Sequence, residues 1–206
     1  LICTEPKTYN GGTAFNKNTV VRYNISQNDR NSVFFINGQI ENTKIYNNTI
    51  YVKAGLNTKM VNTYLRNATS IYAPNYTQFY NNIFYNLGNG GYTLAYNGVS
   101  CRNTVWQNNL FYGNHPASEP ADTGKLTEDP QFVNAGGAGV GRATCSAYYL
   151  KAGSPAIGAG TIVANNGGKD FFGFEVKANY APNIGAYGAG GYGNGSHQPT
   201  PTGTTR

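Results

Sequence analysis

An 11-residue segment occurs four times in this chain, and the four copies superpose without gaps. They span residues 18–28, 42–52, 76–86 and 103–113. The persistent columns are one of threonine (Thr19, Thr43, Thr77, Thr104), one of apolar residues (Val21, Ile45, Phe79, Trp106) and one of asparagine (Asn24, Asn48, Asn82, Asn109). Such a repeat predicts a solenoid, because each copy can bury its apolar side only against the next copy.

The spacing of the repeat predicts about three short strands per coil. Successive members of the asparagine column are 24, 34 and 27 residues apart while the repeated segment stays intact, so the insertions fall in loops. Further extended runs follow at residues 33–36 and 92–96. Coils stacked in parallel would lie about 4.8 Å apart. We expect the asparagine column to turn a corner in the left-handed conformation, with its amides hydrogen-bonded from coil to coil.

The composition favours an all-β chain of one domain. The 206 residues include 27 Gly, 17 Tyr and, by count, 29 Asn, and only 12% are charged. Good helix formers are scarce and turn formers are abundant, which is typical of all-β proteins with many turns. The sequence contains no run of 18 apolar residues, so we expect no membrane span.

The stacked asparagine turns of residues 18–113 resemble the right-handed parallel β-helix proteins of the pectate lyase-like superfamily. A second resemblance covers residues 129–187, where DPQFVN, YYLKAGSPAIGAG, DFFG and PNIGAYG are similar to the closing region of many secreted members. The departures are Gly158 and Asn183, where Asp is usual, and Gly188, where Glu is usual. The resemblance implies a right-handed parallel β-helix over residues 1–187, with 129–187 as its closing region. We interpret residues 188–206, rich in Gly, Pro and Thr, as a flexible linker or tail.

Both ends of a solenoid need cover, because a terminal coil exposes core and unpaired strand edges. We expect the closing region to cap one end. At the other end, residues 1–17 precede the first clear coil, whereas members of the superfamily usually have further coils and a helix there. We therefore expect this chain to be the C-terminal part of a longer protein, or a partner chain to cover its first coil.

The resemblance implies carbohydrate chemistry outside the cell, although the superfamily includes lyases, hydrolases, esterases and non-enzymes. The net charge of +6 favours an acidic polysaccharide as partner, and no dense Lys/Arg cluster indicates nucleic acid. We expect a secreted polysaccharide lyase that cleaves a uronic-acid-containing glycan by β-elimination. The alternatives are a non-catalytic glycan-binding or cell-wall-associated protein and a glycoside hydrolase.

Elimination needs a base for the proton next to the uronate carboxylate and positive charge to hold the charge that develops there. By the resemblance, the loops at residues 26–31, 53–59 and 86–91 would border the glycan cleft. Arg30, Lys53 and Lys59 are therefore the candidate catalytic residues. Asp29 is a candidate calcium ligand, but calcium takes several oxygen ligands and no second acid lies near it in the sequence. The alternative is that these are solvated loop charges.

One outward column of the repeat holds Arg22, Tyr46 and Tyr80. With Arg66 nearby, these residues are the candidate substrate-binding set, because stacked tyrosine rings can form a platform for sugar rings. The alternative is that the ring ladders only stabilise the parallel coils.

Hydrolysis would need two carboxylates on either side of a glycosidic bond. The stretch 115–130 is acidic and contains Glu119, Asp122, Glu128 and Asp129. We interpret it as a solvated connection, with a carboxylate pair as the alternative. The ligands for zinc and the motifs of a serine or cysteine triad are missing from the sequence.

The modification signals suit a secreted protein. Of the five N-x-S/T sites we expect Asn67, Asn75 and Asn194 to carry sugar before Asn24 or Asn47, which belong to the packed turn. Three cysteines indicate one bridge and one unpaired thiol. We expect a disulfide between Cys101 and Cys145, with Cys3 free to pair with a segment outside this chain.

Overall fold

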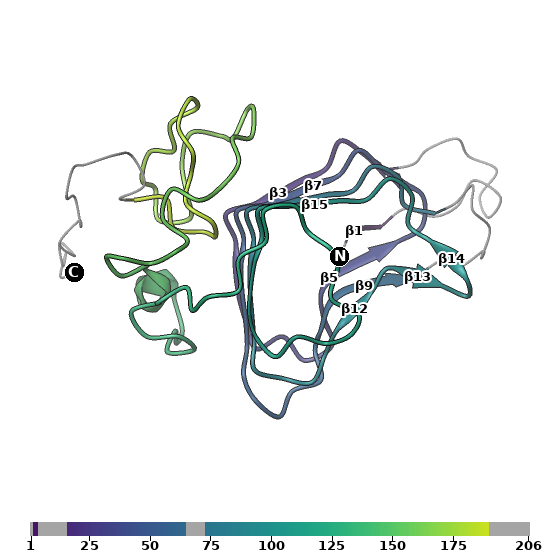
Figure 1. Cartoon of the computed structure of the whole chain (residues 1–206), viewed down its shortest axis with the longest axis horizontal. Helices are drawn as coiled ribbons and strands as arrows, with labels where there is room; N and C mark the ends of the chain where they lie inside the picture. Colours follow the sequence, from purple (N-terminus) through teal and green to yellow (C-terminus); the bar gives the residue numbers. More distant parts are fainter. Residues whose placement is uncertain (1, 4–15, 65–72, 190–206) are drawn as a thin grey trace.

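The computed structural model describes residues 2–3, 16–64 and 73–189, with the backbone alone for residues 2–3. The predicted parallel β-solenoid is confirmed: three sheets surround one core, and the chain passes through them in the same order in each coil (Figure 1). Sheet 1 contains β3 (Val20–Arg22), β7 (Lys44–Tyr46), β10 (Gln78–Tyr80) and β15 (Val105–Gln107). Sheet 2 contains β4 (Ile25–Gln27), β8 (Thr49–Val52), β11 (Ile83–Asn86) and β16 (Leu110–Gly113). Sheet 3 contains β1 (Ile2–Cys3), β5 (Ser32–Asn37), β9 (Lys59–Tyr64) and β12 (Tyr92–Thr93).

Smaller elements lie at the corner between sheet 3 and sheet 1. Strand β2 (Asn16–Lys17) pairs in parallel with β6 (Ile40–Glu41), and β13 (Ala95–Tyr96) forms an antiparallel hairpin with β14 (Val99–Ser100). Among the described residues, the remaining regular element is a 3₁₀ helix, η2 (Arg142–Tyr148). Within the described ranges, no helix is long and apolar enough to cross a bilayer.

The register of the sheets matches the columns of the repeat. In sheet 1 the apolar column is paired strand by strand, with Phe79 opposite both Ile45 and Trp106. The rings of Phe79 and Trp106 stack with centroids 3.9 Å apart. In sheet 2, Phe84 lies opposite Ile50 and Phe111 in the same way. The buried side chains of these columns form one core along the solenoid, so the repeat is the cause of the fold.

At the corner between sheets 1 and 2, two adjacent residues have different roles: one adopts the left-handed backbone and the next contributes its side chain to the asparagine column. The left-handed residue precedes the asparagine column: Asn47, Asn81 and Asn108 have φ of 52°, 54° and 53°, and Tyr23 takes this position in the first coil with 52°. The expectation that the asparagine column itself adopts this conformation is therefore wrong by one position. Asparagine tolerates left-handed backbone better than most residues, which explains the asparagine pair in three of the four copies.

The asparagine column forms a continuous hydrogen-bonded ladder, as predicted. Nδ2 of Asn24 donates to Oδ1 of Asn48 over 2.9 Å, and the step is repeated from Asn48 to Asn82 and from Asn82 to Asn109, each over 2.9 Å. The last asparagine, Asn109, donates to Oδ2 of Asp122 over 2.6 Å. Every link between side chains of the ladder therefore runs from donor to acceptor toward the C-terminal end of the solenoid.

Residues 114–128 cover that end of the solenoid. Thr123 and Leu126 bridge in parallel to Gln107 of sheet 1 and Leu110 of sheet 2, which adds part of a further coil. Nζ of Lys125 lies 5.0 Å from the ring centroid of Phe111 in the core. The stretch that the sequence suggested to be a solvated connection is thus the cap.

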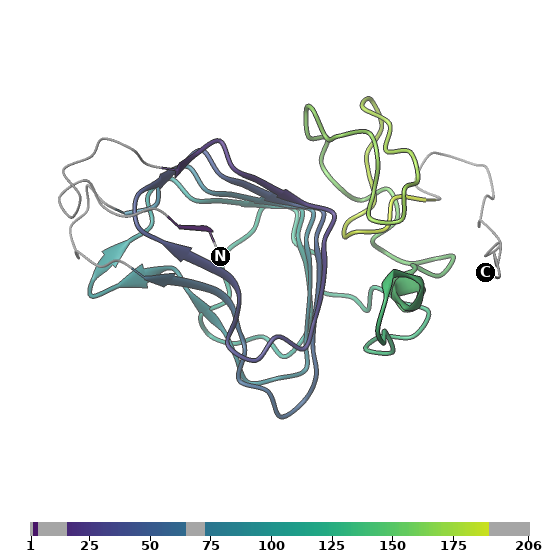
Figure 2. The ribbon, with the colours of Figure 1, turned by 180° about the vertical axis from the view of Figure 1, so that it is seen from behind.

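The segment 129–189 packs on the outside of the solenoid instead of on its end (Figure 1 and Figure 2). Its apolar residues join Tyr51, Ile83 and Leu110 in a second core on sheet 2. Corner amides also hold its backbone: Nδ2 of Asn47 donates to the Asn183 carbonyl over 2.7 Å. The closing region therefore differs from the expected cap, because its apolar surface matches the side of sheet 2.

Candidate functional site

Two adjoining depressions form a groove over sheet 1, and their volumes are about 410 and 180 Å³. They meet at Asn18 and Asn42, which line both. The larger depression is also lined by Lys17, Glu41, Tyr76 and Gln78. The smaller one is also lined by Val20, Lys44, Tyr46, Ala164 and Asn165. The corner between sheets 3 and 1 thus forms one wall, and a loop of the outer segment 129–189 forms the other.

The lining of this groove combines amides, charges and an exposed ring. Asn18, Asn42 and Gln78 present side chains that can both donate and accept hydrogen bonds. Tyr76 is 49% exposed, and its backbone is left-handed with φ 53°. Asn18, Asn42 and Asn103 hold the equivalent left-handed position in the other coils, with φ of 59°, 54° and 49°. A tyrosine there costs more backbone strain than asparagine, and such strain is typical of functional positions.

An ion pair lies at the edge of the groove. Nζ of Lys17 is 3.0 Å from Oε2 of Glu41, and both side chains are partly exposed. A pair in this setting contributes at most about 1 kcal/mol. Glu41 can therefore exchange this partner for a ligand hydroxyl at little cost. Among the described residues that line the groove, Glu41 is the carboxylate.

The predicted substrate-binding residues divide between groove and core. Tyr46 is only 1% exposed, so it is wrong as a sugar platform: the outer segment covers its ring with Val163 and Val176. Tyr46 still contributes to the lining of the groove: its hydroxyl accepts a hydrogen bond from Nη1 of Arg22 over 3.3 Å and donates to the carbonyl of Asn165, another lining residue, over 3.5 Å. Tyr80 is half-buried, and burial raises the pKa of its phenol. Arg66 lies outside the described residues.

The predicted catalytic residues lie on another side of the solenoid. Arg30, Lys53 and Lys59 are exposed at the corner between sheets 2 and 3, where Lys59 pairs with Ser32. The structure does not bring them together with the residues of sheet 1. Asp29 accepts a hydrogen bond from Ser26, and in the described part of the chain no three His, Cys, Asp or Glu side chains are grouped so that they could hold a metal ion. The surroundings of Asp29 therefore do not fit a calcium site.

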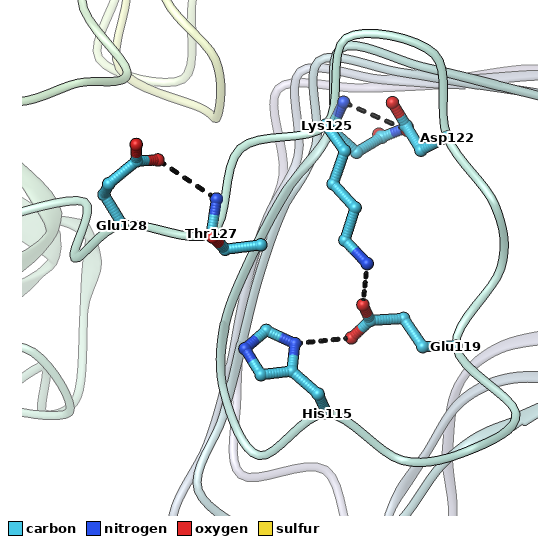
Figure 3. A network of polar contacts seen from close by, with 7 residues as sticks. His115, Glu119, Asp122, Lys125, Thr127 and Glu128 are labelled. Atoms are coloured by element: carbon cyan, nitrogen blue, oxygen red, sulfur yellow. Dashed lines mark hydrogen bonds and ion pairs between the residues drawn. The ribbon is translucent and has the colours of Figure 1, made fainter.

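The acidic stretch of the cap contains a network of polar contacts, and in Figure 3 the side chains of His115 and Lys125 point toward Glu119. Glu119 is paired with Lys125 and also contacts Nδ1 of His115 over 3.0 Å. Burial raises the pKa of the Asp122 carboxyl, and its Oδ1 is buried without a hydrogen-bond partner. Both carboxylates are engaged in holding the cap, one by a cation and one by the asparagine ladder. The network is thus a structural feature of the solenoid end.

A further depression of about 460 Å³ borders this network. It is lined by backbone-rich turns at Gly88, Asn89, Gly90, Gly113, Asn114, His115 and Pro116. Among the described residues that line it there is no carboxylate, and His115 is the one titratable side chain. The groove over sheet 1 has the richer chemistry, so it is the candidate site.

The modification sites fall in different environments. Asn47 is buried and its Nδ2 is engaged, which leaves no space for a glycan. Asn75 is half-buried and its Oδ1 accepts from Asn103 over 2.9 Å. Asn67 and Asn194 lie outside the described residues, as does the side chain of Cys3. Glycosylation at these three predicted sites stays a prediction.

The predicted disulfide between Cys101 and Cys145 is wrong, because both thiols are free. Sγ of Cys101 lies 3.4 Å from Oγ1 of Thr63 in sheet 3, whereas Cys145 belongs to η2 in the outer segment. Counting cysteines gives a possible pairing but no distance, and a disulfide needs Cα atoms within about 7 Å.

Sequence reasoning missed most of the groove. Lys17 and Glu41 lie just before a copy of the repeat and Tyr76 is the first residue of one, at the corner where the connections between copies differ most in length. One signal was available: Tyr76 replaces the asparagine that begins the other three copies. A residue that breaks a repeat at an exposed position indicates a local role.

Comparison with known proteins gave one informative similarity. No protein-family model matches the chain. The chain is similar to a lacto-N-biosidase from Bifidobacterium longum subsp. longum, with 35% identity over 194 aligned residues. The alignment covers 82% of this chain but spans only 11% of that relative's length.

Proposed function

We propose that this chain is the glycan-binding solenoid segment of a carbohydrate-active protein of the glycoside hydrolase class, and that the groove over sheet 1 holds the sugar. The observation that carries the proposal is the similarity to a lacto-N-biosidase over 82% of the chain. The groove supports it, because an exposed ring at Tyr76 and amides at Asn18 and Asn42 suit the faces and hydroxyls of sugars.

This proposal favours the hydrolase alternative over the lyase that the sequence suggested. The similarity is to a protein named as a glycosidase, and the proposed lyase residues Arg30, Lys53 and Lys59 lie away from the groove. Glycoside hydrolysis uses two carboxylates, and the described lining supplies Glu41. We assign Glu41 the role of accepting a sugar hydroxyl, with the hydrolytic pair completed elsewhere in the full-length protein. An acidic ligand and secretion stay predictions.

Calorimetric titration of the protein with lacto-N-biose and with a uronic-acid disaccharide tests the proposal. We expect the neutral disaccharide to bind and Tyr76→Ala to weaken that binding about tenfold, the equivalent of about 1.4 kcal/mol. Tyr180→Ala is the matched control, because Tyr180 is similarly exposed at 53% but lies outside the groove.

The outcomes separate the possible functions. A new reducing end without an unsaturated, ultraviolet-absorbing product identifies hydrolysis by the full-length protein, and the unsaturated product identifies a lyase. Binding of the uronic-acid disaccharide alone would show that the ligand is an acidic glycan, as the sequence suggested. Equal loss of binding in Tyr76→Ala and Tyr180→Ala would place the sugar somewhere other than this groove.

A further inference from the structure

The N-terminal end of the solenoid is a stepped edge in the described part of the chain. Sheet 3 extends one strand further than the other two, because β1 pairs with β5 through Ile2 opposite Ile36. Sheets 1 and 2 end at β3 and β4. Strand β1 is therefore the sheet 3 strand of one more coil, which precedes the coil of β3, β4 and β5. The described residues supply neither the sheet 1 strand nor the sheet 2 strand of that coil.

Chain order says where those two strands must come from. In each described coil the chain passes through sheet 1, then sheet 2, then sheet 3, as in β3, β4 and β5. Since β1 is a sheet 3 strand, the first two strands of its coil precede Ile2. Ile36 follows its ladder asparagine by 12 residues (36−24) and Thr63, its register partner, follows by 15 (63−48). The corresponding corner lies about the same distance before Ile2, upstream of Leu1.

The ladder has an open acceptor at this end. Asn24 uses its backbone N–H and Nδ2 as donors to Oδ1 of Asn48, over 3.0 and 2.9 Å. In each later coil, Oδ1 accepts this pair of donors from the preceding coil. Oδ1 of Asn24 accepts no hydrogen bond from the residues that the structure describes. It is therefore a template for one more asparagine corner.

Burial across the columns agrees with this reading. Asn24 is exposed, whereas its counterparts Asn48 and Asn82 are fully buried. Val21 is half-buried although Ile45 and Phe79, in the same column, are fully buried. The first described coil thus has the sequence of an interior coil and the exposure of a terminal one. A parallel strand edge in this state is a ready site for pairing.

We propose that β3 and β4 form the docking edge for a strand–asparagine–strand segment that lies N-terminal to Leu1 in a longer form of this protein. The incoming corner donates its backbone N–H and its side-chain amide to Oδ1 of Asn24, and its strands pair with β3 and β4. Because Lys17, Asn18 and Val20 stand at this edge, the added coil also lengthens the groove over sheet 1. The similarity to a relative of which this chain spans 11% is consistent with such a longer form.

Hydrogen–deuterium exchange of single amides tests the proposal. Asn28 N–H donates to the Tyr51 carbonyl, and the Asn24 carbonyl accepts from Thr49 N–H. Since alternate residues of a parallel strand bond to opposite sides, the amides of Ile25 and Gln27 face the open edge. We expect these two amides to exchange at least tenfold more slowly in the natural longer protein than in residues 1–206. Ser26, which faces β8, is the internal control and should be similar in both.

A pair of variants gives an independent readout of the same edge. In residues 1–206 we expect Asn24→Ala to lower Tm less than Asn82→Ala, whereas in the longer protein the two should lower Tm equally. The same small effect of Asn24→Ala in both forms would overturn the proposal, as would unchanged exchange at Ile25 and Gln27. Slow exchange at these amides in residues 1–206 together with a concentration-dependent dimer would assign the edge to a second copy. A gene whose product begins at Leu1 would also refute it.

Discussion

In each of the three asparagine pairs at the corner between sheets 1 and 2, two adjacent residues of the same type have different roles. The first asparagine supplies left-handed backbone and points its amide outward; the second turns its amide inward to the ladder. Inside, Nδ2 of Asn48, Asn82 and Asn109 also donates to the carbonyls of Val21, Ile45 and Phe79. The sequence could predict a ladder from the repeated column, but it could not tell which of two identical neighbours takes the strained backbone.

The end of the ladder provides a prediction at a single residue. Burial raises the pKa of Asp122, because it disfavours the ionised carboxyl in the folded state. The free energy of unfolding therefore falls as the pH rises through that raised pKa. By the pattern of the other coils, an asparagine at position 122 would direct its Nδ2 at the Trp106 carbonyl. We therefore expect Asp122→Asn to raise Tm at pH 7.

Thermal unfolding followed over a range of pH checks this effect. The advantage of Asp122→Asn should shrink as the pH falls through the raised pKa of the aspartic acid, because the wild-type carboxyl is then neutral. Asp129→Asn, at an exposed acid of the same stretch, is the control. A Tm at pH 7 below that of the wild type would show that the carboxylate is the preferred end of the ladder.

At the scale of elements, outward asparagines attach the segment 129–189 to the solenoid. Asn81 accepts from the Thr161 N–H over 2.8 Å and donates to the Thr161 carbonyl over 2.8 Å. Asn108 donates to the Ala159 carbonyl over 3.1 Å. The repeat predicts contacts along the solenoid axis, since neighbouring copies must stack. It carries no information on what packs against the side, so the burial of Tyr46 could not be predicted.

The attachment predicts a local change when one amide is removed. Asn81→Gly keeps the left-handed backbone at low cost and removes the side chain that binds Thr161. We expect faster hydrogen exchange at the Thr161 amide, by about fivefold or more, which corresponds to the loss of about 1 kcal/mol from one hydrogen bond. Asn42→Gly, at an equivalent left-handed position of another corner, should leave Thr161 unchanged. An equal effect of both variants would indicate general loosening of the solenoid.

At the scale of the whole molecule, tyrosines hold the solenoid and its outer segment together. Burial, with smaller effects of Asp129, Tyr112 and Tyr51, raises the pKa of Tyr85 to about 12. Burial also raises the pKa of Tyr187 to about 12, with additions from Tyr149 and Asp170. The sequence could predict that the tyrosine columns stack. It could not predict that the outer segment would cover them, because that depends on contacts more than 100 residues apart, such as Tyr148 with Gln27.

These shifts predict loss of stability at alkaline pH. An unfolded tyrosine has a pKa of about 10. Well below pH 10, these tyrosines therefore keep their protons in both the folded and the unfolded chain. Between about pH 10 and 12 the unfolded chain releases protons that the folded chain retains, and the free energy of unfolding falls as the pH rises. Denaturant unfolding should show this slope, and Tyr85→Phe with Tyr187→Phe should reduce it. Tyr180→Phe, at an exposed ring, is the control, and an unchanged slope in the double variant would contradict the prediction.

The forward polarity of the asparagine ladder has a consequence for the growing polypeptide on the ribosome. Each corner presents donors whose acceptor belongs to the coil that is synthesised next. In a coil that has just emerged, water therefore occupies the place of this acceptor until the following corner appears, and the last donor reaches its acceptor only when Asp122 arrives. We therefore expect the ladder to be completed in the direction of synthesis, because a chain released before residue 122 leaves it incomplete at its newest corner.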